Sequence, residues 1–146
     1  MMLKRLSIVA FTALTLGCGD DRPRLRVVTE GKSFDRASVP STSISPVAFV
    51  PFTVTNDGNQ TAFLPTCGSR IAPVVEQMVN GHWESYASGF CILSSVMVPL
   101  ELGAGQSHDD EVAIGAPGHF RIRMPYSSDA QLSKHFDAVS WQFDVH

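Results

Sequence analysis

Apolar and polar residues alternate with a period of two along much of the chain after residue 24. The alternation is most regular over 47–55, 119–124 and 139–145, where every second residue is apolar. Successive side chains of a pleated strand point to opposite faces, so this pattern predicts strands with one buried face. No segment carries the spacing of a long amphipathic helix. Residues 129–135 are predicted to form at most one helical turn, with Asp129 as its cap.

Turn-forming residues separate the predicted strands. Asn56-Asp57-Gly58 ends the strand over 47–55, and 61–64 is predicted to return from that turn. Asn80-Gly81 is the favoured pair for a two-residue type I′ turn and predicts a hairpin over 74–86. That register places Val79 opposite His82, Met78 opposite Trp83, and Val75 opposite Tyr86.

Further strands are predicted near 25–29, 92–102 and 111–114. A total of about seven to nine short strands with turns between them is typical of a β-sandwich or barrel. A chain of 146 residues is long enough for one such domain and too short for two ordinary ones. The sequence therefore predicts an all-β class and a single folded unit.

The first residues have the pattern of an export signal. Lys4 and Arg5 precede an apolar run over 6–16, and small Gly17 stands before Cys18. A basic head, a short apolar run and a small residue at the break are typical of a secretory signal. The run is far shorter than the roughly 20 residues that span a bilayer as a helix.

Leu14-Thr15-Leu16-Gly17-Cys18 resembles the lipobox of bacterial lipoproteins, although Thr15 stands where that family usually has Leu. The resemblance implies that residues 1–17 are a removed signal peptide and that Cys18 becomes the acylated N-terminus. Residues 18–23 would then be a short tether and 24–146 the domain. The membrane would be a partner through the lipid, and the location extracytoplasmic, in the periplasm or at the cell surface. A soluble secreted protein and an uncleaved apolar N-terminus remain the alternatives.

The target membrane also follows only from that resemblance. Gly19, and not Asp, follows Cys18, and in lipoproteins of Gram-negative bacteria this permits transfer to the outer membrane. Both the cell membrane and the outer membrane stay open.

The chain has three cysteines, an odd number. If Cys18 is lipidated, Cys67 and Cys91 remain as a pair, and outside the cytoplasm such a pair is expected to be oxidised. A loop of about 25 residues closed by this disulfide would add roughly 3–4 kcal/mol of stability in the chain-entropy model. The competing interpretation is a free catalytic cysteine.

Four segments in order resemble motifs of bacterial immunoglobulin-like domains. They are 52–58, similar to F-x-V-x-N-x-G; 100–107, similar to L-x-L-x-P-G-E-S; 118–123, similar to G-x-Y-R-L-R; and 140–145, similar to a closing strand. The resemblance covers most of 47–145 and implies an immunoglobulin-like antiparallel β-sandwich. The families suggested are uncharacterised bacterial lipoproteins and, more distantly, the BsuPI-like proteinase-inhibitor domain, whose reactive site maps onto no residue here.

The charge balance argues against nucleic acid as a partner. The formal net charge is −3, and removing Lys4 and Arg5 with the signal leaves −3 − 2 = −5 for residues 18–146. Binding to phosphates needs clustered Lys and Arg. For Arg22, Arg24 and Arg26 two interpretations stay open: contact with anionic lipid headgroups, or a solvated strand edge.

No constellation of catalytic or metal-binding residues stands out. His108-Asp109-Asp110-Glu111 carries ligand types for a cation, but alternation on a strand lets only His108 with Asp110, or Asp109 with Glu111, converge. A solvated turn and edge strand is the simpler interpretation. The histidines lack ligand spacing, and no G-x-S-x-G elbow or C-x-x-C motif is present. We therefore expect no enzyme, no cofactor and no metal.

Four aromatic residues, Trp83, Tyr86, Phe90 and Trp141, either belong to the core or form an exposed patch for a partner. Three functions stay open at this stage. The first is a non-enzymatic, membrane-anchored envelope module with an interaction or structural role, its partner possibly another envelope protein. The second is a proteinase-inhibitor-like domain, and the third a small hydrolase or metal-binding protein.

Overall fold

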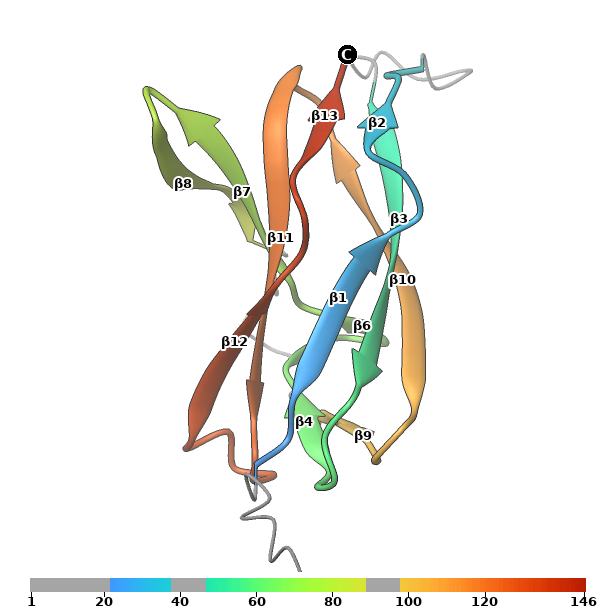
Figure 1. The fold of residues 1–146 in the computed structure, drawn as a ribbon, viewed down its shortest axis with the longest axis vertical. Helices are drawn as coiled ribbons and strands as arrows, with labels where there is room; N and C mark the ends of the chain where they lie inside the picture. The colour runs from blue at the N-terminus through green and yellow to red at the C-terminus, as the bar shows by residue number, and fades with distance from the viewer. Residues whose placement is uncertain (1–21, 38–46, 89–97) are drawn as a thin grey trace, which may run out of the picture.

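The computed structural model describes residues 22–37, 47–88 and 98–146, and these segments form strands joined by turns, with no helix among them (Figure 1). The strands are β1 (Leu25–Thr29), β2 (Ser33–Phe34), β3 (Ala48–Asn56), β4 (Ala62–Leu64), β5 (Thr66–Cys67), β6 (Arg70–Ile71), β7 (Val74–Val79), β8 (His82–Ser88), β9 (Leu100–Leu102), β10 (Ser107–Ile114), β11 (Gly118–Ser127), β12 (His135–Val139) and β13 (Phe143–Val145).

Two sheets form the layers of a sandwich. Sheet A has the order β1-β3-β10, with both pairings antiparallel. Sheet B is built on the long strand β11, which pairs with β13 and β12 on one side and with β7 and β4 on the other. β8 and β9 extend sheet B outward from β7 and β4, while β2 joins β13 in parallel. The predicted all-β, immunoglobulin-like antiparallel sandwich is confirmed.

The structure has more and shorter strands than the sequence predicts. The strand predicted over 61–64 is observed as β4, whereas the one predicted over 139–145 is interrupted between the end of β12 at Val139 and the start of β13 at Phe143. Of the strand predicted over 92–102, only β9 belongs to the described residues. The short strands β2, β5 and β6 lie outside the predicted strand segments and leave the class of the fold unchanged.

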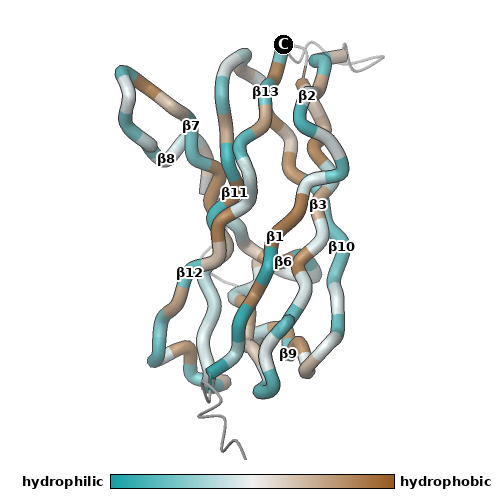
Figure 2. Tube along the Cα trace, viewed as in Figure 1, coloured by the Kyte–Doolittle hydropathy of each residue, from teal (hydrophilic) through white to brown (hydrophobic). Residues whose placement is uncertain are grey.

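The core lies between the two sheets and collects the inward residues of the alternating strands. Figure 2 shows hydrophobic and hydrophilic residues alternating along several of these strands. Phe52 of β3 and Phe120 of β11 are among its largest fully buried side chains. The ring of Phe143 stacks on Phe120 at 6.2 Å between centroids and meets Phe34 edge-on at 5.7 Å. Burial of such side chains is the main force that joins the layers, at roughly 1.5–3 kcal/mol for each large apolar residue.

The turn after β3 differs from the predicted hairpin. β4 does not return along β3 but pairs with β9 and β11 in sheet B. The cause is Asn56, whose buried side-chain amide donates to the carbonyl oxygens of Gln60 at 2.7 Å and Leu102 at 2.8 Å. Because these bonds tie the end of β3 to the start of the other sheet, the chain crosses between layers here.

The β7–β8 hairpin confirms most of its predicted register and projects away from the sandwich (Figure 1). Asn80 and Gly81 both have positive φ, 50° and 83°, as a type I′ turn requires. The predicted Val75–Tyr86 pair is wrong, because a bulge between Val75 and Glu76 shifts the ladder by one residue. The shift lets Tyr86 reach the core, where its ring meets Phe120 edge-on at 5.2 Å.

The predicted helical turn at 129–135 is also wrong. This segment is a loop between β11 and β12, and Leu132 has a φ of 55°, which a right-handed helix does not allow. Asp129 still caps the loop: its carboxylate accepts from the backbone N–H of Ser133 at 3.0 Å and of Lys134 at 3.2 Å. The predicted role of Asp129 as a helix cap is therefore wrong, and its carboxylate instead closes a chain reversal between antiparallel strands.

Candidate interaction surface on sheet B

The outer surface of sheet B carries charged side chains from three adjacent strands. In the register, Arg121 of β11 lies opposite Glu76 of β7, and Arg123 lies opposite Val139 of β12. The inward neighbours of the two arginines, Phe120 and Ile122, are fully buried. Strand alternation therefore holds Arg121 and Arg123 on the outside of the sheet, on a rigid base.

Glu76 is the centre of an ion-pair network on this surface. Its two carboxylate oxygens accept separately from Arg121 Nε at 2.6 Å and from Arg123 Nε at 2.8 Å. Arg123 also donates from Nη1 to Asp137 at 3.1 Å on β12. The Glu76 side chain is only 11% exposed, so its charge depends on these partners rather than on water.

The electrostatics favour the ionised form of Glu76. Burial acts to raise the pKa of Glu76, but the hydrogen bonds from Arg123 and Arg121 outweigh it, and the pKa lies below its usual value. The hydrogen bond to Glu76 raises the pKa of Arg123 against the opposing effect of burial. The network is therefore fully charged at neutral pH and fixes the orientation of both guanidinium groups.

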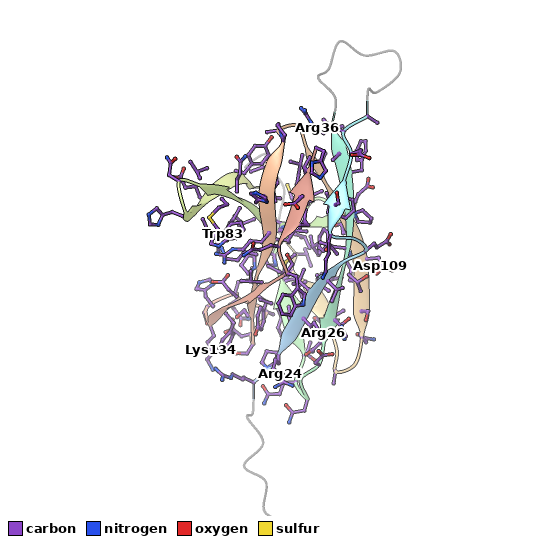
Figure 3. The ribbon with its side chains drawn as sticks, turned by 45° about the horizontal axis from the view of Figure 1, so that its top comes forward. Arg24, Arg26, Arg36, Trp83, Asp109 and Lys134 are labelled. Carbon is purple, nitrogen blue, oxygen red and sulfur yellow. The ribbon has the colours of Figure 1, made fainter. Side chains whose placement is uncertain are left out.

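An aromatic side chain covers the first arginine. The guanidinium carbon of Arg121 lies 4.4 Å from the ring centroid of Trp83 on β8, within cation–π distance. Trp83 is the second residue of β8, close to the Asn80-Gly81 turn of the projecting hairpin (Figure 3). The contact links the β7–β8 hairpin to the sheet beneath it and places a flat aromatic ring beside the network.

On the other side of Arg121, the chain between β12 and β13 bulges outward. Arg123 pairs with Val139 and Phe120 with Phe143, so three residues here face two on β11. Ser140 holds the bulge: its N–H donates to the Ile122 carbonyl oxygen at 2.9 Å, and its hydroxyl accepts from the Ile122 N–H at 2.9 Å. Bulges re-aim side chains. The next residue, Trp141, is 81% exposed.

We name this region the Arg–Trp face and define it by Glu76, Trp83, Arg121, Arg123, Val139 and Trp141. Val139 adds a second exposed apolar side chain, at 44%. Tryptophan and arginine are the residue types most enriched in the energetically dominant parts of protein interfaces. The arrangement offers a partner an exposed apolar ring beside guanidinium groups that are already ordered.

The predicted aromatic patch is thus divided by the structure. Trp83 and Trp141 belong to the Arg–Trp face, Tyr86 turns into the core, and Phe90 lies outside the described residues. Sequence reasoning missed Glu76 and the two arginines as members. The alternation over 119–124 places Arg121 and Arg123 on the outside, but their meeting with Glu76 depends on which strand lies beside β11.

The polar segment 108–111 lies on β10 with its side chains sorted to alternate sides, as predicted. Asp109 accepts from the Thr53 hydroxyl at 2.7 Å on the outside of sheet A, and Asp110 pairs with Arg70 of β6 through Nε at 2.9 Å. Within the described ranges, no three His, Cys, Asp or Glu side chains gather where they could hold a metal ion.

Two of the predicted cysteine sites lie outside the described residues, namely Cys18 and Cys91. Cys67 is half-buried on β5. The lipidation of Cys18 and the Cys67–Cys91 disulfide therefore remain predictions. In the described part of the chain, no helix has the length and hydropathy needed to cross a membrane.

Comparison with known proteins assigns no family to the chain. No family model matches it, and no curated protein matches it closely enough to count as a relative. An X-ray structure of a structural genomics target is similar, with 19% identity, coverage of 86% of this chain and 87% of the other, and a TM-score of 0.42. The CARDB domain of a Pyrococcus furiosus protein in complex with di-metal ions is similar at 14% identity, full coverage of both chains and a TM-score of 0.38.

A β-glucosidase involved in saponin metabolism from intestinal bacteria is also similar, with 12% identity and a TM-score of 0.37. The match covers 87% of this chain but only 16% of that enzyme. At these identities and TM-scores the likenesses carry no functional argument. The class of the protein, an all-β sandwich, rests on its own strands.

Proposed function

We propose that this chain is a non-enzymatic, membrane-anchored lipoprotein of the bacterial cell envelope, and that the Arg–Trp face is where it binds another envelope protein. The basic head, short apolar run and Gly17-Cys18 support export and acylation. Several acyl chains at one site give durable anchoring, whereas a single chain gives only marginal binding. The folded domain would then act at the membrane as a rigid recognition module.

The exposure of Trp141 is the observation that carries the binding role. A tryptophan side chain is large and mostly apolar, and leaving it 81% in water forgoes the free energy that its burial would give. The Ser140 bulge fixes its direction, and the Glu76 network immobilises Arg121 opposite the bulge. Because these groups are ordered in advance, a partner loses little conformational entropy in contacting them.

Site-specific crosslinking in the native envelope tests this role. Benzoylphenylalanine placed at position 141 of the full chain should give, on irradiation, one crosslinked species of defined mass. Phe49 on the outer surface of sheet A is the matched control position, because it is also aromatic and is 52% exposed. The same reagent at position 49 should give no such species.

A substitution then measures the contribution of the ring. Trp141→Ala should weaken binding to the crosslinked partner, once that partner is purified, by at least about tenfold, as expected for a central interface tryptophan. The free energy of unfolding of the Trp141→Ala variant should differ from that of the wild type by less than about 0.5 kcal/mol, because the ring is mostly exposed. Equal crosslinking at positions 141 and 49, or unchanged affinity in the variant, would contradict the assignment of this face.

Cys18→Ser tests the anchor separately. The intact mass of the wild-type protein should show the acyl adduct on Cys18, and the protein should sediment with membranes. The variant should lack the adduct and the lipid-dependent sedimentation. A wild-type mass without any acyl adduct would exclude the lipoprotein assignment and leave the Arg–Trp face to be judged by the crosslinking.

A further inference from the structure

The end of the sandwich where β1 begins gathers cationic side chains. Arg22, Arg24 and Arg26 alternate with the buried Pro23 and Leu25, so the three arginines share the exposed side of the segment. Lys134, from the β11–β12 loop, is exposed at the same end (Figure 3). Arg36 lies at the opposite end of the molecule (Figure 3).

This segment is held firmly against the fold. The Tyr126 hydroxyl donates to the Pro23 carbonyl oxygen at 3.3 Å. Gly58 packs directly on the chain: a Cβ at this position would lie 2.5 Å from the Arg24 nitrogen. Since only glycine permits such an approach, the backbone of 22–24 is fixed against the 57–59 turn. The positions of these arginine backbones are therefore set by the folded domain.

Two acidic residues of the described part of this end, Asp57 and Asp129, have partners within the fold. Asp57 pairs with Arg26, with Oδ2 2.7 Å from Nε. Asp129 turns its carboxylate into its own loop, where it accepts from the Ser133 and Lys134 N–H groups. A hollow of about 230 Å³ lies between Arg22, Arg24 and the 57–59 turn. Arg22 and Arg24 line this hollow together with Asp57, and Lys134 is exposed at the same end of the molecule.

The length of the tether sets the distance of this end from the anchor. Cys18 precedes Arg22 by four residues, which span at most about 14 Å when fully extended. If Cys18 is acylated, as the proposed function holds, the basic end must lie near the lipid headgroups. Cations at such a distance are attracted to anionic lipids, by roughly a fivefold gain in binding for each Lys or Arg.

We propose that Arg22, Arg24 and Lys134 form a docking surface for anionic phospholipid headgroups, so that the lipid-anchored sandwich stands end-on upon the membrane. This inference rests on the proposed anchoring at Cys18. The remainder of the domain carries the negative charge of the chain and faces away from the lipid. The Arg–Trp face then lies along the side of the sandwich, open to a neighbour in the envelope.

The reactivity of the two lysines of the mature chain can measure which end of the domain faces the membrane. Only Lys32 and Lys134 follow Cys18 in the sequence. Lys32 directly precedes β2, and β2 lies toward the end of the molecule opposite the β11–β12 loop that contains Lys134 (Figure 1). The full lipidated chain is reconstituted in vesicles of phosphatidylcholine alone, or of phosphatidylcholine mixed with phosphatidylglycerol. Both lysines are then labelled with an amine-reactive reagent and quantified by peptide mass spectrometry.

Lys134 labelling should fall about fivefold in the anionic vesicles relative to phosphatidylcholine vesicles, while Lys32 labelling stays constant. High salt should restore the labelling, because it screens the attraction. Arg24→Gln should restore it in part. Arg36→Gln, which removes the same charge from the opposite end, should leave the protection of Lys134 unchanged.

Three outcomes would overturn the docking surface. The first is equal reactivity of Lys134 in both kinds of vesicle, and the second is protection that salt does not reverse. The third is an equal effect of Arg24→Gln and Arg36→Gln. The intact mass of the same sample shows whether Cys18 carries its lipid. An acylated, sedimenting protein with unprotected Lys134 refutes the end-on orientation alone, whereas a protein without lipid refutes the proposed anchoring.

Discussion

The outer surfaces of the two sheets follow the same alternation but carry different chemistry. On sheet A, short polar side chains pair across strands: Thr53 donates to Asp109, and Thr55 shares a hydrogen bond with Ser107 at 2.9 Å. On sheet B, long charged and aromatic side chains form one connected network around Glu76. On sheet A, polar side chains form hydrogen bonds with their cross-strand neighbours. On sheet B, the network fixes the two guanidinium groups, and Trp141 nearby stays exposed to water.

The difference teaches that exposure alone does not mark a binding surface. Sheet A also exposes apolar residues, Phe49 at 52% and Val28 at 38%. These two residues lie apart on the sheet. Val28 is on β1 and pairs with Thr53 of β3, which is four residues along β3 from Phe49. On sheet B the exposed ring of Trp141 lies in the bulge between β12 and β13, next to β11, which carries the ordered guanidinium groups. Proximity to fixed polar groups is what distinguishes the Arg–Trp face.

The largest effect should come from Glu76→Gln. The change leaves the guanidinium groups of Arg121 and Arg123 without their shared counter-charge, and we expect a loss of about 2 kcal/mol in the free energy of unfolding. Asp109→Asn on sheet A should cost less than about 0.5 kcal/mol, because it alters an exposed pair. Urea unfolding of both variants measures the contrast. Equal losses would remove the distinction between the two surfaces.

The second test uses pH. The pKa of Glu76 in the folded protein is below its ordinary value of 4.5, so its ionised form stabilises the fold at pH values above 4.5. That contribution is lost as the pH falls through the lower, folded pKa. The stability gap between wild type and Glu76→Gln should therefore be constant near neutrality and narrow in acid. A gap that widens with acidification would contradict the direction of the shift.

The smallest effect concerns the ring over Arg121. Trp83→Leu keeps an apolar side chain on β8 beside Arg121 but removes the aromatic face, and should cost about 0.5–1 kcal/mol. A double-mutant cycle with Arg121→Gln isolates the coupling between the two side chains. A coupling energy of zero would show that Trp83 acts on the hairpin only through its volume.

The alternation of the sequence correctly predicted the central strands β3 and β11 and their buried sides. Phe52, Ile122 and Phe143 were placed inward because every second residue around them is apolar. The partner of each strand was harder to predict, since periodicity says nothing about neighbours. Asn56 illustrates this: its sequence signals a turn, but its buried bonds to Gln60 and Leu102 depend on a strand from the other sheet.

The same limit applied to the candidate site. Trp83 and Trp141 were recognised as potential binding residues, but the sequence could not separate them from Tyr86, whose ring enters the core because of one bulge. Glu76 gave no signal of its own, because a single acidic residue in a strand is ordinary. Its role arises from the pairing of β7 with β11, which brings together residues 45 and 47 positions apart.

The placement of β1 has a mechanical consequence. Its first residue, Leu25, follows the end that we propose to face the membrane, and the strand runs from there antiparallel to β3 over five residue pairs. A pull between the anchor and a neighbour bound farther along the sandwich would load these pairs in shear, all at once, and would not peel them apart singly. The geometry thus suits a component that must hold its shape under tension.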